Sequence, residues 1–78
     1  MNVTNIKGRM DYIDVYFDNG NVARIEGELL HGGFHAEPST IRQWKVPAGQ
    51  SISAEEKTDI IKAVISKTKG SHMVIQFE

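Results

Sequence analysis

The chain has 78 residues, with nine lysine and arginine residues against ten aspartate and glutamate residues, and no cysteine. This length fits a single domain over residues 1–78, and a net charge of −1 argues against a general nucleic-acid-binding protein. The lack of cysteine excludes thiol chemistry and thiolate zinc sites, and it favours a reducing, cytoplasmic location. No apolar run approaches the roughly 18 residues of a membrane span, and residues 1–5 lack signal-peptide features.

The front half of the chain has the alternation and turn residues of antiparallel strands. A first strand is expected over residues 3–7 and a second over residues 10–17, with a turn at Gly8-Arg9. Period-two alternation gives the second strand two faces: Asp11, Ile13, Val15 and Phe17 on one, and Tyr12, Asp14 and Tyr16 on the other. Asn19-Gly20 then predicts a hairpin in which both turn residues take positive φ.

The returning strand is expected over residues 22–29. Its alternation places Ala23, Ile25 and Leu29 on one face and Arg24, Glu26 and Glu28 on the other. Gly27 inside this strand indicates a bulge or a close approach of another backbone segment. Gly32-Gly33 then breaks the chain, and residues 34–37 form a short fourth strand or extended segment.

The helix is the clearest element of the sequence. Ser53 is an N-cap candidate, and Glu56 three residues later completes a capping box. The apolar stripe that follows has helical spacing and consists of Ile60, Ile61, Val64, Ile65 and Thr68. Gly70 suits the position after the helix end, and residues 72–77 form a last strand with Met73, Ile75 and Phe77 facing inward.

These elements predict an α+β two-layer sandwich, in which a mostly antiparallel sheet of β-β-β-β-α-β order carries one helix on one face. One helix covers only one side of a sheet. The other side should face solvent or a partner, and its residues are Tyr12, Asp14, Tyr16, Arg24, Glu26 and Glu28. Residues 1–37 hold six acidic and three basic residues, so this half is mildly acidic. Tyrosines among carboxylates suit a basic protein partner, although they also support ordinary cross-strand pairs.

Patterns that could carry enzymatic or metal chemistry are weak. His31 and His35 have helical ligand spacing, but Gly32-Gly33 between them excludes a helix, and no third ligand is evident. Glu26 and Glu28 share a strand face, yet nothing indicates that either is buried with a raised pKa. The sequence therefore predicts no enzyme, no catalytic or metal-binding residues and no cofactor.

The irregular stretch over residues 38–47 contains the only tryptophan and both prolines. A small domain seldom leaves so long a connection unstructured unless it covers the core or carries function. Trp44 could close the end of the core, with Pro47 stiffening the backbone, or it could anchor an interface. We favour the first interpretation, because a single tryptophan in a small domain is usually used for packing.

Four segments together resemble a known family: Gly33-Phe34; Ser39-x-Ile41-x-x-Trp44-x-x-Pro47; Ile52-Ser53-x-Glu55-Glu56-Lys57-x-x-Ile60-Ile61; and Ile75-x-Phe77. The pattern is similar to the small bacterial immunity proteins of polymorphic toxin systems, most closely to the immunity protein 74 family. The resemblance covers most of the chain and is densest from Gly33 to Ile61. Matching motif positions, expected to be structural, are Ile41, Trp44, Pro47, Ser53 and Glu56.

This resemblance implies a non-enzymatic toxin inhibitor that acts in the cytoplasm by a protein–protein interaction. Such a protein binds and neutralises a cognate toxin domain of a polymorphic toxin or contact-dependent inhibition system. Many of these toxins are nucleases, and an acidic face with tyrosines would mimic nucleic acid in a basic groove. The alternative is a small structural or regulatory module that self-associates, for instance as a homodimer through the open sheet face. Neither hypothesis involves nucleic acid or a membrane as partner.

Overall fold

The computed structural model describes residues 1–77, which form the α+β fold that the sequence predicts. The elements are β1 (Val3–Gly8), β2 (Tyr12–Phe17), β3 (Val22–Leu30), β4 (Gly33–Ala36), a short 3₁₀ helix η1 (Pro38–Thr40), α1 (Ala54–Thr68) and β5 (Val74–Phe77). Their order along the chain is β-β-β-β-α-β, as expected.

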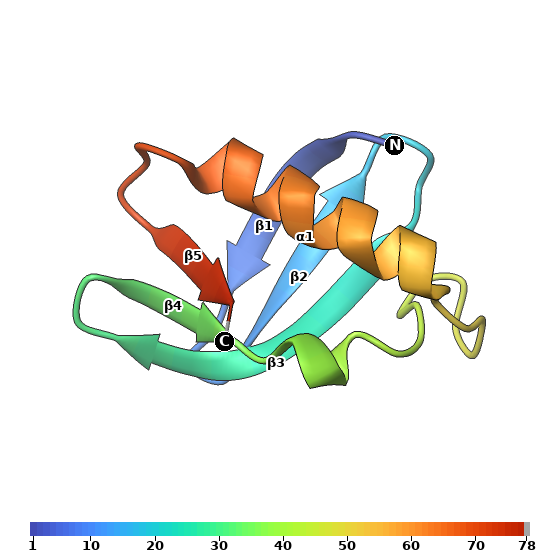
Figure 1. Cartoon of the computed structure of the whole chain (residues 1–78), viewed down its shortest axis with the longest axis horizontal. Helices are drawn as coiled ribbons and strands as arrows, with labels where there is room; N and C mark the ends of the chain where they lie inside the picture. The colour runs from blue at the N-terminus through green and yellow to red at the C-terminus, as the bar shows by residue number, and fades with distance from the viewer. Residues whose placement is uncertain (78) are drawn as a thin grey trace.

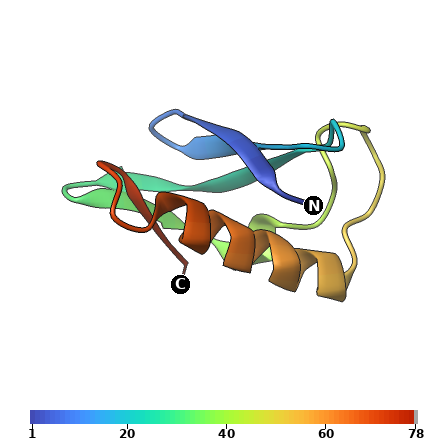
Figure 2. The ribbon, with the colours of Figure 1, turned by 90° about the horizontal axis from the view of Figure 1, so that it is seen from above.

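The five strands form one curled sheet in the spatial order β1-β2-β3-β4-β5. The first four strands pair antiparallel with their neighbours, whereas β4 and β5 pair parallel. A parallel pair needs a long crossover connection, and α1 is part of that crossover. The helix lies across one face of the sheet, which gives two layers and leaves the opposite, outer face of β1–β3 without a helix (Figures 1 and 2).

The β2–β3 hairpin forms where Asn19-Gly20 predicts it, but its turn is of another type. Among the described residues only glycines have positive φ, so Gly20 takes it (φ +88°) and Asn19 does not. The Gly20 N–H donates to the Phe17 carbonyl at 3.1 Å, and the Asn19 side chain accepts from the Asn21 N–H at 3.0 Å. A longer turn with one left-handed glycine therefore replaces the two-residue turn that we expected.

Strand β3 carries Ala23, Ile25 and Leu29 on one face, as expected. Ala23 and Ile25 are buried there, whereas Leu29 is 41% exposed. Leu29 pairs with Phe34 near the tip of the β3–β4 hairpin, beyond the central core. The predicted close approach at Gly27 is confirmed, since a Cβ there would lie 2.1 Å from the His35 carbonyl oxygen.

Helix α1 begins with the predicted capping box. The Ser53 Oγ accepts from the Glu56 N–H at 3.0 Å, and the Glu56 carboxylate accepts from the Ser53 N–H at 2.9 Å. Ile60 and Val64 are buried, Ile61 is half-buried, and Ile65 is 46% exposed. Each residue along a helix turns the side-chain direction by about 100°. Ile60, Val64 and Thr68 are therefore the buried residues of α1, and the buried stripe is narrower than expected.

Thr68 joins the end of α1 to β5. Its hydroxyl donates to the Val64 carbonyl at 3.0 Å and accepts from the Ile75 N–H at 3.3 Å. Gly70 follows with φ +77°, in the left-handed conformation expected after a helix end. Strand β5 starts at Val74 rather than at residue 72, so Met73 lies before the strand and is 42% exposed instead of facing inward.

The core lies between the sheet and the helix. Its buried members are Ile13, Val15, Phe17, Ala23, Ile25, Phe34, Ala36, Ile41, Trp44, Ile60, Val64 and Ile75. Asp11, which alternation placed on this face, is exposed because it precedes β2, which begins at Tyr12 and not at residue 10 as expected. The core is small, as expected for a chain of this length.

The stretch after η1 packs over one end of this core. Trp44 is 2% exposed and meets the Phe17 ring edge to face, with ring centroids 5.8 Å apart. Backbone hydrogen bonds hold the stretch in place: the Val22 N–H donates to the Val46 carbonyl at 3.0 Å, and the Trp44 N–H donates to the Gln50 carbonyl at 2.8 Å. Residues 41–51 thus form an ordered cover.

Candidate functional site

The outer face of β1–β3 carries the residues that the sequence singled out for partner binding. Strand register brings Lys7, Asp14 and Arg24 into one row across the three strands. In the next row of the same face, Tyr12 lies opposite Glu26. Alternation along β2 and β3 therefore gathers the predicted set on one surface.

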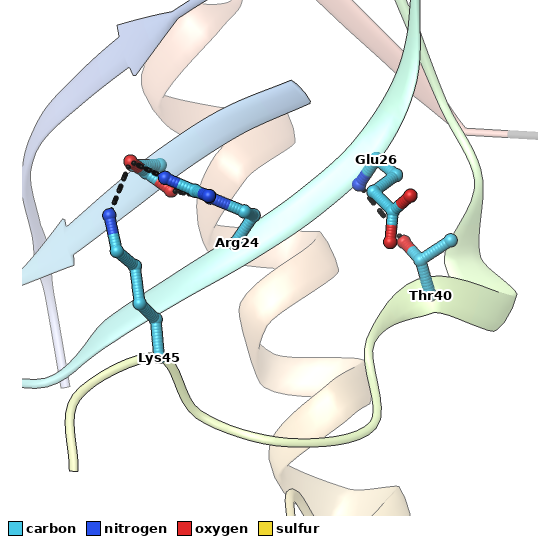
Figure 3. A network of polar contacts seen from close by, with 5 residues as sticks. Arg24, Glu26, Thr40 and Lys45 are labelled. Carbon is cyan, nitrogen blue, oxygen red and sulfur yellow. Dashed lines mark hydrogen bonds and ion pairs between the residues drawn. The ribbon is translucent and has the colours of Figure 1, made fainter. Parts of the chain in front are cut away.

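Asp14 is the centre of an ion-pair cluster on this face. Figure 3 labels its two cationic partners, Arg24 and Lys45. The Arg24 guanidinium donates to both carboxylate oxygens, with Nε 2.9 Å from Oδ1 and a terminal nitrogen 3.0 Å from Oδ2. Lys45, which belongs to the loop over residues 41–51, donates from its Nζ to the same Oδ2 at 3.0 Å. These two cations cover Asp14, which is only 6% exposed, although alternation places it on the sheet face without a helix.

Hydrogen bonding by Arg24 is the main cause that holds the pKa of Asp14 below its ordinary value, and Lys45 lowers this pKa further. Partial burial opposes both effects by disfavouring the charged form. Asp14 therefore stays a carboxylate, and its bidentate contact fixes the position of the Arg24 side chain.

Both tyrosines of the face lie beneath cations. The Arg24 guanidinium carbon is 3.9 Å from the centroid of the Tyr12 ring, and Lys7 Nζ is 5.4 Å from the centroid of the Tyr16 ring. Both rings are half-buried. Stacking and ion pairing thus order long side chains before any partner arrives, which lowers the entropy lost on binding.

The outer face is less acidic than the sequence suggests. Its three carboxylates, from Asp14, Glu26 and Glu28, are balanced by the cations of Lys7, Arg24 and Lys45. Glu26 and Glu28 have exposed side chains. The Glu26 backbone N–H donates to the Thr40 hydroxyl at 3.1 Å, which ties β3 to η1 (Figure 3).

A shallow pocket of about 480 Å³ lies beside the cluster, where β3 meets the loop. Its lining residues are Arg24, Glu26, Thr40, Arg42, Gln43, Trp44 and Lys45. Sequence reasoning missed Arg42, Lys45 and Thr40 as neighbours of this face. The turn expected at Gly8-Arg9 is wrong, because Gly8 ends β1 and pairs with Ile13, which brings Lys7 opposite Asp14. No local signal indicates that the loop brings Lys45 to Asp14.

The motif positions lie mainly in the scaffold. Ile41 and Trp44 are buried, Ser53 and Glu56 cap α1, and Pro47, which follows a cis peptide bond, is exposed. The indole N–H of Trp44 is buried and has no hydrogen-bond partner within residues 1–77.

The described part of the chain contains no group of three or more His, Cys, Asp or Glu side chains that could hold a metal ion. His31 lies in the β3–β4 turn and His35 within β4, so the two do not share a helix. No helix over residues 1–77 is long and apolar enough to cross a membrane.

Comparison with known proteins links the chain to a protein family. The sequence model of the family described as immunity protein 74 matches residues 5–78, which is nearly the whole chain. No curated protein and no solved structure matches the chain significantly. Because the match extends from β1 to the end of the sequence, the chain belongs to the immunity protein 74 family.

Proposed function

We propose that this chain is an immunity protein that binds a cognate toxin domain of a polymorphic toxin or contact-dependent inhibition system and neutralises it in the cytoplasm. The observation that carries the proposal is the family match over residues 5–78. The protein acts by binding rather than by catalysis. It protects the producing bacterium and its siblings by holding the toxin in an inactive complex.

The toxin-binding surface in this proposal is the outer face of β1–β3. Tyr12, Tyr16 and Arg24 are of the residue types that dominate interface energetics. Arg24 lies over Tyr12 and is held by Asp14, and Lys7 lies over Tyr16. Asp14 acts as a positioning residue there, because its own carboxylate is covered. Glu26 and Glu28 supply the exposed negative charge of the contact.

A nuclease is one toxin class that this surface fits in part. If the toxin is a nuclease, Glu26 and Glu28 are the carboxylates that would meet its basic groove, because Asp14 already binds two cations of its own chain. Electrostatic attraction of this kind acts mainly on the association rate and weakens with added salt.

Co-expression tests the proposal directly. The toxin domain encoded beside this chain is expressed with and without it, and growth and co-purification are scored. We expect growth arrest that only this protein relieves, together with a stable complex. Toxicity that persists without a complex would contradict the proposal. Sedimentation of the free protein as a dimer would then favour the self-associating module.

A matched pair of charge reversals maps the surface. Glu26→Lys changes an exposed carboxylate on the outer face, whereas Asp59→Lys makes the same change on the exposed side of α1. We expect Glu26→Lys to weaken toxin binding by about tenfold and Asp59→Lys to leave it unchanged. Equal affinities for both variants would place the toxin contact elsewhere.

A further inference from the structure

An apolar groove lies at the end of the molecule opposite residues 41–51. It has a volume of about 660 Å³. Its walls come from β1, the β1–β2 turn, the end of β3, the last turn of α1, and β5 with the residues just before it. These segments gather at the end of the ribbon where α1 finishes (Figure 2).

Three large apolar side chains of the groove are exposed to solvent. Met10 is 78% exposed, Met73 is 42% exposed and Leu29 is 41% exposed. Their backbones are held in place: the Leu29 N–H donates to the Met10 carbonyl at 2.9 Å, and the Ser71 hydroxyl donates to the Met73 carbonyl at 2.8 Å. Apolar side chains that gather on a positioned backbone in a small domain indicate a binding surface.

The charge of the groove narrows the choice of occupant. Arg9 and Lys67 are among its lining residues, and the lining includes no aspartate or glutamate. This local positive charge stands against a net charge of −1 for the whole chain. An occupant with apolar side chains and a carboxylate would satisfy both properties of the groove.

A second copy of the chain fits less well. In a two-fold dimer the same surface patch of each copy forms the contact. Arg9 and Lys67 of both copies would then lie close together at the interface, and like charges there repel. A different protein with the opposite charge has no such penalty.

We propose that the groove binds a segment of the cognate toxin that presents apolar side chains flanked by a carboxylate. This inference rests on the proposed function, and it adds a contact surface separate from the outer face of β1–β3. The toxin's apolar side chains pack against Met10, Leu29 and Met73, and its carboxylate pairs with Arg9 or Lys67. Methionine suits such a site because its flexible side chain adapts to irregular surfaces.

Two variants test the groove with the full chain and the purified cognate toxin domain in titration calorimetry. Met10→Ser/Met73→Ser removes apolar contacts, and Arg9→Glu/Lys67→Glu reverses the charge. We expect each variant to bind the toxin at least about tenfold more weakly than the unmodified chain. Matched controls are Ile65→Ser and Lys62→Glu, at exposed positions on α1 that do not line the groove, and they should bind within about twofold.

The outcomes separate this inference from the proposed function. Absence of toxin binding by the unmodified chain would overturn both. If the unmodified chain binds and both groove variants keep its affinity, the groove assignment fails while the immunity function stands. If instead the free protein sediments as a dimer that the groove variants dissolve, the occupant is a second copy. Unfolding curves of the variants ensure that lost binding does not reflect lost folding.

Discussion

The two ends of the sandwich are finished in different ways. At the end where the β2–β3 turn and the start of α1 lie, residues 41–51 cover the core, and Trp44 is buried against Phe17 (Figure 2). At the other end, β1, the end of β3, the last turn of α1 and β5 line a cavity of about 660 Å³. A groove opens there, and Met10, Leu29 and Met73 remain exposed.

Residues 41–51 stabilise the fold, whereas the groove at the other end is the surface that we propose for the toxin. The loop that closes the first end orders many residues, and the burial of a tryptophan offsets that entropy cost. At the second end the chain leaves apolar area in water, which gives no stability to the monomer. Substitutions at the closed end should therefore reduce stability, and those at the open end should reduce binding.

The largest effect on the free energy of unfolding is expected at the end that residues 41–51 cover, here called the closed end; the end with the groove is the open end. Trp44→Ala should lower the free energy of unfolding by about 3–5 kcal/mol, because it removes a large buried side chain and leaves a cavity. Denaturant unfolding followed by circular dichroism measures this loss. Trp44→Phe is the control, since it keeps an aromatic ring against Phe17 and removes the unpartnered indole N–H. A Trp44→Ala variant with native stability but no toxin binding would make Trp44 a binding residue instead.

A second prediction concerns the hairpin that forms one wall of the open end. Gly27→Ala would place a Cβ 2.1 Å from the His35 carbonyl oxygen, so β3 and β4 would have to move apart. We expect a loss of about 1–3 kcal/mol in unfolding free energy. Gly8→Ala is a matched control, because its Cβ would meet Ile13 at an ordinary 3.7 Å. Equal stabilities of the two variants would show that the close approach at Gly27 is easily relaxed.

Sequence patterns predicted the fold because each local signal agrees with the global arrangement. The capping box at Ser53, the alternation around Val15 and the hairpin at Gly20 each act within a few residues, and the structure contains all three. The parallel pairing of β4 with β5 was not predicted, because a helical connection permits a parallel pair but does not choose β4 as the neighbour of β5.

The candidate surfaces depend on contacts that local patterns do not contain. Alternation placed Asp14 on the outer face, but it gives no sign that Lys45, 31 residues away in the chain, covers the Asp14 carboxylate. Met73 was expected inside because it continues an alternating pattern, and Leu29 lies on the core face beside Phe34, yet both side chains are more than 40% exposed. The curvature of the sheet and the end of the helix decide their exposure, and neither follows from strand periodicity.

A third, smaller effect is predicted for the ion-pair cluster. Asp14→Asn should reduce the unfolding free energy by about 1 kcal/mol near neutral pH, because Arg24 and Lys45 lose a charged partner but remain partly solvated. Denaturant unfolding of the variant and the unmodified chain measures the difference. The same experiment over a range of pH tests the cause.

The pH dependence follows from the lowered pKa of Asp14. The folded state favours the carboxylate, so its stabilisation is complete above the ordinary value of 3.8 and is lost as pH falls through the lower folded value. The backbone N–H of Asn2, which donates to the Asp18 carboxylate, likewise lowers the pKa of Asp18. The difference between Asp14→Asn and the unmodified chain isolates Asp14, and it should vanish in acid. A difference that persists unchanged at low pH would contradict the ion-pair origin.

The smallest effect on stability is expected at the open end, and it distinguishes the two ends most sharply. Met10→Ser should change the unfolding free energy by less than about 0.5 kcal/mol, because the side chain is 78% exposed and contributes little to the core. Thermal unfolding measures this, with Trp44→Ala as the opposite extreme. If Met10→Ser also leaves toxin affinity unchanged, Met10 is an ordinary exposed residue. A stable variant with weakened binding would instead place Met10 in the contact, because only a partner can make use of an apolar side chain that the folded monomer leaves in water.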